Sequence, residues 1–519
     1  APLLGLAMRH RAATILIALL LLGSTAWPLA RVGSEFMPPL DEGDILYMPT
    51  TFPGLSITKA RELLQQTDRI LATFPEVQSV FGKAGRAETA TDPAPLSMFE
   101  TTIRLKPREQ WPDPSKSTRE LMDEMDRAIR FPGLANSWTM PIKTRLDMLS
   151  TGIKTPVGIK LSGPDLAVLQ GLSEQIEGVL KQAPGTLSAF GDRAVGGYYL
   201  DFDVDREQAA RYGLTVGAIQ DVIRTAIGGM NVTETIEGLE RYPVNVRYPR
   251  GLREDLETLQ RVLIPTPTGK QVPLAMVASI SYERGPPVIK SEGARPNAWI
   301  YVDIDSADIG GYVEDAQRLV AQSVDLPAGY TLSWSGQYEY MQRAAQRLSV
   351  VGPVTIGLIL VLLYLHFRNV VTPLVVLLAV PFGLIGGLWL VYINGYNLSV
   401  AVAVGFIALA GLAAEIGVLV LSFIDVEVAA LRRERDGAVT ASLVRERVVY
   451  ATSRRVRPVV MTVVSTMAGL APIMLSHGTG SDVTHRIAAP MLGGMLSVLV
   501  LTLLVLPVIY SLVLERRER

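Results

Sequence analysis

The chain has 519 residues, of which 49% are hydrophobic and 19% are charged, and its mean hydropathy is +0.28. This combination predicts apolar membrane spans joined to a water-exposed region. A net charge of −1 offers no basic balance for a nucleic-acid partner, so we expect none. The absence of cysteine excludes disulfides and thiolate metal sites.

The first elements to predict are the membrane spans, because a bilayer core about 30 Å thick needs roughly 20 apolar residues per helix. One buried core helix could imitate such a segment, but six of them, five packed into the last third of the chain, favour membrane spans. The six segments are residues 12–32, 350–367, 371–393, 398–424, 456–475 and 487–513.

Arginine placement predicts the orientation of these spans. If the six helices alternate in direction, the arginine-rich regions all lie on the same side of the membrane. The positive-inside rule predicts that this side is the cytoplasmic one. Both termini are then cytoplasmic, and residues 33–345 lie in the periplasm of a Gram-negative cell. Residues 426–451 alternate apolar and basic residues, which predicts a helix along the cytoplasmic interface. The regions carry Arg9 and Arg11, Arg368, eight arginines within 432–457, and Arg516, Arg517 and Arg519.

The region outside the membrane, residues 33–345, is predicted to be α+β. Strands are predicted at 44–52, 77–83 and 99–105, with helices at 55–74 and 117–129. The order then recurs loosely at 157–162, 166–182, 198–205, 206–211 and 216–227, and a later copy includes 298–303, 310–324 and 332–336. Such units are typical of ferredoxin-like split βαβ modules.

Glu415 is the first candidate for chemistry, because it lies inside the fourth predicted span. An ionised carboxylate at mid-membrane costs roughly 2.5–3.5 kcal/mol on insertion scales. Desolvation should raise its pKa, which suits a proton carrier. The alternative is a protonated glutamate that bonds a neighbouring helix. The other spans offer no ionisable partner at mid-depth, only Thr462, Ser465 and Thr466.

Methionines are the second candidates, since a thioether is a soft, uncharged ligand that suits Cu(I) and, by the same logic, Ag(I). Met48 falls in a predicted strand, Met98 precedes another, and Met148 follows Asp147. For any one of them, gap-filling in a core is the ordinary role. The residues alone do not bring the three together.

Other site types have weaker signals. The four histidines, at 10, 366, 477 and 485, are too sparse for a closed metal site. Asp201, Asp203 and Asp205 share one strand face, which favours solvation over hard-cation binding. No GxxxxGK[ST] or GxSxG motif occurs, so neither an ATP-driven protein nor a hydrolase is indicated, and an enzyme has no support.

Seven stretches carry a family resemblance along essentially the whole chain. They resemble the heavy-metal branch of the resistance-nodulation-division (RND) transporters, and within it the copper/silver exporters. One helix, a periplasmic domain of βαβ modules and five further helices is the plan of each half of such a pump. The stretches are DEGDILYMP (41–49), FGKAGRAETATD (81–92), ETTIRLKP (100–107), DMLSTGIK (147–154), ARYG (210–213), GFIALAG (405–411) and RIAAPM (486–491).

The resemblance implies site residues. The branch's three-methionine site for Cu(I) or Ag(I) falls on Met48, Met98 and Met148, with cleft neighbours at Glu100, Arg145 and Lys154. An exit-path methionine corresponds loosely to Met230, which stands one position early. The membrane carboxylate of the proton relay falls on Glu415. The relay lysine and a membrane methionine are replaced here, by Val459 and Thr484.

The resemblance also implies the whole assembly. The chain is expected to be the C-terminal half of a proton/metal antiporter that forms a homotrimer, with the N-terminal half missing. Its expected partners are a periplasmic membrane-fusion adaptor and an outer-membrane channel, it sits in the inner membrane, and it has no permanent cofactor. The expected domains are a first span (1–33), a porter subdomain (34–133), a second porter subdomain (134–185 with 276–345), a docking insertion (186–275) and a five-helix bundle (346–519).

Two other functions stay open from the residues. A divalent-cation exporter of the same branch, for zinc, cobalt, cadmium or nickel, would use carboxylates such as Asp201 or Glu100. A non-transporting membrane scaffold would not need Glu415 at all.

Overall fold

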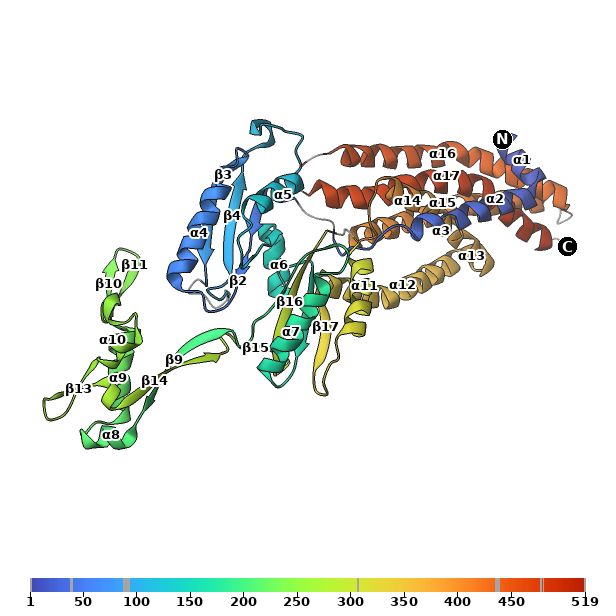
Figure 1. Ribbon diagram of the computed structural model, residues 1–519. Helices are drawn as coiled ribbons and strands as arrows, with labels where there is room; N and C mark the ends of the chain where they lie inside the picture. The colour runs from blue at the N-terminus through green and yellow to red at the C-terminus, as the bar shows by residue number, and fades with distance from the viewer. Residues whose placement is uncertain are drawn as a thin grey trace. The chain divides into compact units, whose positions relative to one another are not determined.

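The computed structural model describes residues 2–37, 41–86, 94–305, 308–434, 439–476, 478 and 480–517. Two compact units make up this part of the chain: residues 1–192 with 290–519, and residues 193–289. The larger unit contains the membrane helices and two α+β modules (Figure 1).

Six helical segments of the described chain are long and apolar enough to cross a membrane, which confirms the predicted count. Short helices α1 (Pro2–Arg9) and α3 (Ala26–Leu29) flank α2, and α13 (Val371–Leu377) leads into α14. The six segments are Arg11–Leu29, Gln337–Phe367, Val371–Ile393, Val400–Glu434, Ala441–Leu475 and Ser481–Arg516.

The bundle packs around α17 (Ser481–Arg517), which contacts α14 (Ala379–Ile393), α15 (Val400–Glu434) and α16 (Ala441–Leu475) (Figure 1). Small residues let the backbones approach closely, as is usual between membrane helices. By contrast, the apolar window of α12 (Gln337–Phe367) is not buried within this chain. Trp27 stacks on Trp389, as in an aromatic belt.

The predicted interfacial helix over 426–451 is wrong for the residues that the structure describes. Residues 426–434 continue α15, and residues 441–451 form the first turns of α16. No proline or glycine interrupts either run, so each membrane helix simply extends beyond its apolar stretch. The amphipathic pattern arises because both extensions bury one face, with Val428 and Val448 fully packed.

The first module is a four-stranded antiparallel sheet in the order β3-β4-β1-β6. This is the order of a ferredoxin-like split βαβ unit, as expected from the repeated pattern. Tyr47, Leu121 and Met125 lie in the core between the sheet and its helices. The elements are β1 (Asp44–Tyr47), β2 (Thr50–Thr51), α4 (Ile57–Leu71), β3 (Val77–Ala84), β4 (Phe99–Leu105), η1 (Arg108–Gln110), α5 (Thr118–Ala128), β5 (Leu134–Ala135) and β6 (Trp138–Thr139).

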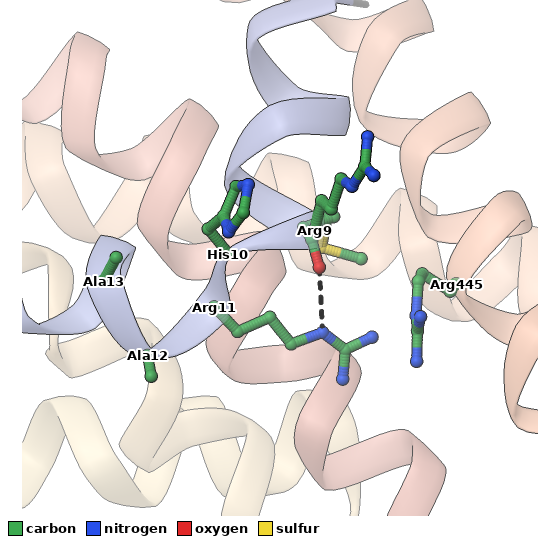
Figure 2. Close-up of a pocket in the computed structure, with 7 residues that line it drawn as sticks. Arg9, His10, Arg11, Ala12, Ala13 and Arg445 are labelled. Carbon is green, nitrogen blue, oxygen red and sulfur yellow. Dashed lines mark hydrogen bonds between the residues drawn. The ribbon is translucent and has the colours of Figure 1, made fainter.

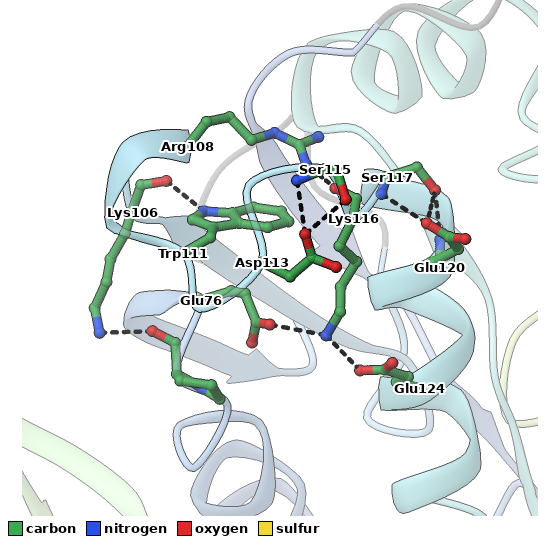
Figure 3. A network of polar contacts seen from close by, with 11 residues as sticks. Glu76, Lys106, Arg108, Trp111, Asp113, Ser115, Lys116, Ser117, Glu120 and Glu124 are labelled. Atoms are coloured by element: carbon green, nitrogen blue, oxygen red, sulfur yellow. Dashed lines mark hydrogen bonds and ion pairs between the residues drawn. The ribbon is translucent and has the colours of Figure 1, made fainter.

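A polar network joins α5 to the start of β3 (Figure 3). Lys116 donates to the buried carboxylate of Glu76 and to Glu124, both at 2.8 Å, and these two bonds raise its pKa. Ser117 and Glu120 form a capping box at the first turn of α5. The network therefore fixes the position of the N-terminus of α5 relative to the sheet.

The second module has the same architecture. Its strands β7 (Val157–Ser162), β8 (Thr186–Gly191), β16 (Arg295–Ile304) and β17 (Thr331–Gly336) lie in the order β17-β7-β16-β8, all antiparallel. Its helices are α7 (Leu166–Leu180) and α11 (Ile309–Ser323), and β15 (Lys290–Glu292) extends one edge. The split βαβ order is thus repeated, and α6 (Pro141–Thr151) links the two modules.

Residues 193–289 form the smaller unit, inserted between β8 and β16, with its own core around Ile219, Ile264 and Leu274. Its boundaries differ from the expected 186–275, because β8 pairs within the second module and β14 pairs with β9. Its elements are β9 (Gly197–Val204), α8 (Arg206–Arg211), α9 (Val216–Val222), η2 (Ile223–Gly228), β10 (Met230–Glu237), β11 (Glu240–Val246), η3 (Arg250–Leu252), α10 (Leu256–Gln260), β12 (Leu263–Pro265), β13 (Gln271–Pro273), η4 (Leu274–Met276) and β14 (Ala278–Gly285).

Candidate functional site

Met48 lies in the short connection between β1 and β2 and is completely buried. Its amide donates to the Ser137 carbonyl at 2.8 Å, which ties it to the residue before β6. Its carbonyl accepts a hydrogen bond from Lys154 Nζ, also at 2.8 Å. Hydrogen bonds therefore hold both the amide and the carbonyl of Met48.

Met98 lies directly before β4 and is half-buried. It forms an isolated antiparallel bridge with Thr50, and the next amide, of Phe99, donates to the Pro49 carbonyl at 3.2 Å. The structure thus brings the chain segments of Met48 and Met98 together, although 50 positions separate them in sequence.

Met148 lies on α6, half-buried, in a helix that contacts both β1 and β17. Glu42 caps the start of α6 by accepting from the amides of Ile142 and Lys143, at 2.7 and 2.8 Å. Gly152 ends it at φ +79°, a left-handed conformation that favours glycine. Helix α6 was missed from the sequence, although Pro141 and Gly152 are a usual start and stop pair.

Lys154 is the best-defined of the three expected neighbours. It is buried and donates to Met48 and to Thr50 Oγ1. Burial, and then the charge of Lys290, lowers the pKa of Lys154 to about 7. Glu100 pairs with Lys83 at 3.2 Å. Arg145 is exposed on α6 and makes no ion pair with a residue that the structure describes.

A buried polar group beside Lys154 had no signal in the sequence. Lys290 Nζ lies 2.7 Å from Asp192 Oδ2 and 3.1 Å from the Tyr301 hydroxyl. Burial alone would lower the pKa of Lys290, but Tyr301 and Asp192 outweigh it and raise that pKa. Residues from positions 154, 192, 290 and 301 meet here, so only the tertiary fold reveals the group.

Glu415 lies on α15 with its side chain exposed on the surface of the described bundle. Val459, at the expected lysine position, is buried on α16, and the exposed Thr484 donates to the Ser481 carbonyl. These three residues therefore form no relay with one another in the structure.

Two charged groups of the bundle were not singled out from the sequence. Asp425, on the same helix as Glu415, accepts a hydrogen bond from the buried Tyr510, whose hydroxyl also lies 3.1 Å from Thr372 Oγ1. At the opposite end, Glu35 and Arg486 pair at 2.9 Å. Burial raises the pKa of Glu35 against the opposing effect of Arg486.

The remaining candidates lie in the smaller unit. Met230 begins β10 of the smaller unit and is exposed. Asp205 caps α8, and Asp201 and Asp203 stand opposite Ser281 and Ser279. Among the described residues, no group of three or more His, Cys, Asp or Glu side chains could hold a metal ion.

Comparison with known proteins agrees with this architecture. The sequence model of the AcrB/AcrD/AcrF family matches residues 1–514. The chain belongs to this family. This is the family of the RND transporters.

Its relatives are named as cation efflux or metal resistance proteins. The chain is 45% identical over all its 519 residues to the cation efflux system proteins SilA of Salmonella typhimurium and CusA of Escherichia coli (strain K12), covering 49% and 50% of their lengths. The cobalt-zinc-cadmium resistance protein CzcA of Cupriavidus metallidurans is 36% identical over 532 aligned positions. The chain spans about half the length of these relatives.

A solved structure matches the same extent. The crystal structure of a heavy metal efflux pump, crystal form II, superimposes with a TM-score of 0.86 at 30% identity, over 99% of this chain and 52% of that one. This likeness supports the α+β membrane fold with a porter region.

Proposed function

We propose that this chain acts in the proton-driven efflux of Cu(I) and Ag(I), and that Met48, Met98 and Met148 bind the metal ion. The observation that carries the proposal is the bridge between Thr50 and Met98, which joins the segments of two of these methionines. The third stands on α6, a helix that contacts the strand just before Met48.

Thioether chemistry supports a soft, monovalent ion as the cargo. Methionine needs no deprotonation and suits Cu(I), whereas hard or borderline cations favour carboxylate and imidazole ligands. The buried Lys154 beside Met48 also disfavours a highly charged cation at this position, because the protonated amine of Lys154 repels the cation. Its pKa of about 7 leaves the amine partly neutral near neutral pH.

The name of CzcA refers to resistance to cobalt, zinc and cadmium, whose common ions are divalent. A divalent cargo has less support in this chain. Glu100 already pairs with Lys83, and Asp201 lies in the other unit. The higher identity to SilA and CusA than to CzcA points the same way.

For energy coupling, we propose that Glu415 carries the proton. Its exposed position on a membrane helix is costly unless a further part of the pump covers it or it is protonated. We therefore expect the helix face around Glu415 to be covered by the half of the pump that the relatives have beyond this chain's length. A scaffold without transport would have no need for an acid there.

The same proposal includes the topology and assembly. The arginine-rich ends of the helices face the cytoplasm by the positive-inside rule, and both α+β modules face the periplasm. Residues 193–289 then dock partners, in a homotrimer with an adaptor and an outer-membrane channel. The self-contained core of that unit fits an inserted docking element.

Metal tolerance of cells tests the proposal. The full-length pump would be expressed in a strain without its own copper and silver exporters, with Met98→Leu, Met148→Leu or Glu415→Gln. Methionine to leucine conserves volume and usually costs less than about 1.5 kcal/mol. We expect each variant to lose most of the silver and copper tolerance at an unchanged membrane level, measured by immunoblot.

Met276→Leu is the matched control, because Met276 is half-exposed in the smaller unit and should leave tolerance intact. Unchanged silver tolerance in both methionine variants would contradict the metal site. Zinc tolerance that falls with Glu100→Gln while silver tolerance holds would favour a divalent cargo. Full function of Glu415→Gln would favour a scaffold.

A further inference from the structure

A basic hollow of about 560 Å³ lies where α1 ends and α2 begins, beside the first part of α16 (Figure 2). The chain bends at His10 between the two helices, which exposes several polar groups at one place. The lining residues are Met8, Arg9, His10, Arg11, Ala12, Ala13 and Arg445.

The arginines of this hollow outnumber the acids that contact them. Arg11 donates to Glu515 Oε2 at 2.9 Å and to the Met8 carbonyl at 3.2 Å. Arg445 reaches the same carboxylate at 3.4 Å. Arg9 is exposed and makes no ion pair with a residue that the structure describes. Among the described residues, one carboxylate therefore serves two arginines while Arg9 has no acidic partner, so the described lining of the hollow carries an excess of positive charge.

Apolar surface adjoins these charges. Leu4 and Met8 of α1 pack against α17, where Ser511 contacts the Met8 sulfur at 3.8 Å. Leu3 and Leu6 point the other way and are 70% and 58% exposed. A helix with one packed face and one exposed apolar face, ending in arginines, fits the boundary between acyl chains and headgroups.

We propose that this hollow binds the phosphate headgroup of an anionic phospholipid of the inner leaflet. Guanidinium groups recognise phosphate through paired, charge-assisted hydrogen bonds. Basic pockets between membrane helices on the cytoplasmic side are suited to such lipids, because that leaflet is negatively charged. The exposed leucines of α1 provide contact for the acyl chains, which a soluble anion lacks. The site is separate from the metal-binding methionines and does not depend on the cargo.

Native mass spectrometry of the purified protein in detergent, titrated with phosphatidylglycerol, tests this. Arg9→Gln combined with Arg445→Gln should weaken phosphatidylglycerol binding by about tenfold or more. Arg9→Lys with Arg445→Lys, which keeps the charge but not the paired hydrogen bonds, should weaken binding less than the glutamine pair does. Arg433→Gln is the matched control, an exposed arginine at the end of α15 outside the hollow, and should change affinity by less than about twofold.

Two further measurements identify the ligand. Zwitterionic phosphatidylcholine should bind at least about tenfold more weakly than phosphatidylglycerol, and millimolar inorganic phosphate should not displace the lipid. Equal binding of both lipids, equal binding by the glutamine pair, or displacement by phosphate would each overturn the proposal. Because the lysine pair tests the same positions with charge retained, misfolding cannot imitate the expected result.

Discussion

At the residue scale, Asp303 gives the second module a pH dependence. It lies on β16 opposite Ser188 of β8, and burial raises its pKa to about 6 against the opposing hydrogen bond from the Ile304 amide. In an unfolded chain the ordinary value is 3.8. The folded protein thus keeps a proton that the unfolded chain releases, so stability falls as the pH rises from about 4 to about 6.

Asp303→Asn should remove this loss. The amide oxygen can still accept from Ile304, and no charge is buried, so the variant should be more stable than the wild type at about pH 8, by about 1 kcal/mol, and equal at about pH 4. The gain stays small because the side chain keeps partial contact with solvent. Thermal unfolding at both pH values measures it, and the exposed Asp325→Asn serves as control. A gain of equal size at both pH values would contradict the assignment.

At the element scale, the contact between α14 and α17 depends on two glycines. A Cβ atom at Gly386 would lie 1.9 Å from the Gly493 carbonyl oxygen, and one at Gly493 would lie 2.3 Å from the Gly386 carbonyl oxygen. Both clashes are with backbone, so a side chain at either position must push the helices apart. Close approach of this kind is a main source of packing between membrane helices.

Gly386→Ala should therefore destabilise the bundle by about 1–3 kcal/mol, the usual cost of overpacking. Gly411→Ala is the control, because no atom lies within 4 Å of its added Cβ and alanine is the better helix former. Thermal unfolding in detergent and the monodisperse fraction on size exclusion compare the two. Equal unfolding midpoints for both variants would show that α14 and α17 can separate without cost.

How far the sequence predicted these elements depended on the range of the interactions. Span count and strand positions such as 99–105 follow from local hydropathy and periodicity, and they agree with the structure. The interfacial helix failed because an amphipathic pattern also describes a long helix whose end packs on its neighbours. The approach of the Met48 segment to Met98 depends on the bridge between Thr50 and Met98, across 48 positions, which no local pattern encodes.

At the scale of the whole molecule, the chain comprises two compact units, the smaller one inserted into the larger one along the sequence. The smaller unit leaves the second module after Asp192 and returns at Lys290, and these two residues form an ion pair at 2.7 Å. The ends of the insertion therefore lie close together, while strands β8 and β16 on either side pair with each other. An insertion with adjacent ends can be removed with little strain on its host.

Replacing residues 193–289 by a linker of about four Gly and Ser residues should leave the larger unit folded, since such a linker spans the short gap between Asp192 and Lys290. All six tryptophans lie outside the excised segment, so tryptophan fluorescence reports on the larger unit alone. We expect its thermal transition to stay cooperative, with the midpoint within about 4 °C of the wild type. As a control, the same linker joined to Arg295 would delete Lys290 and β15, and it should lower the midpoint further. If the first excision abolished the cooperative transition, the larger unit would need the smaller one to fold, and the insertion would not be an independent docking element.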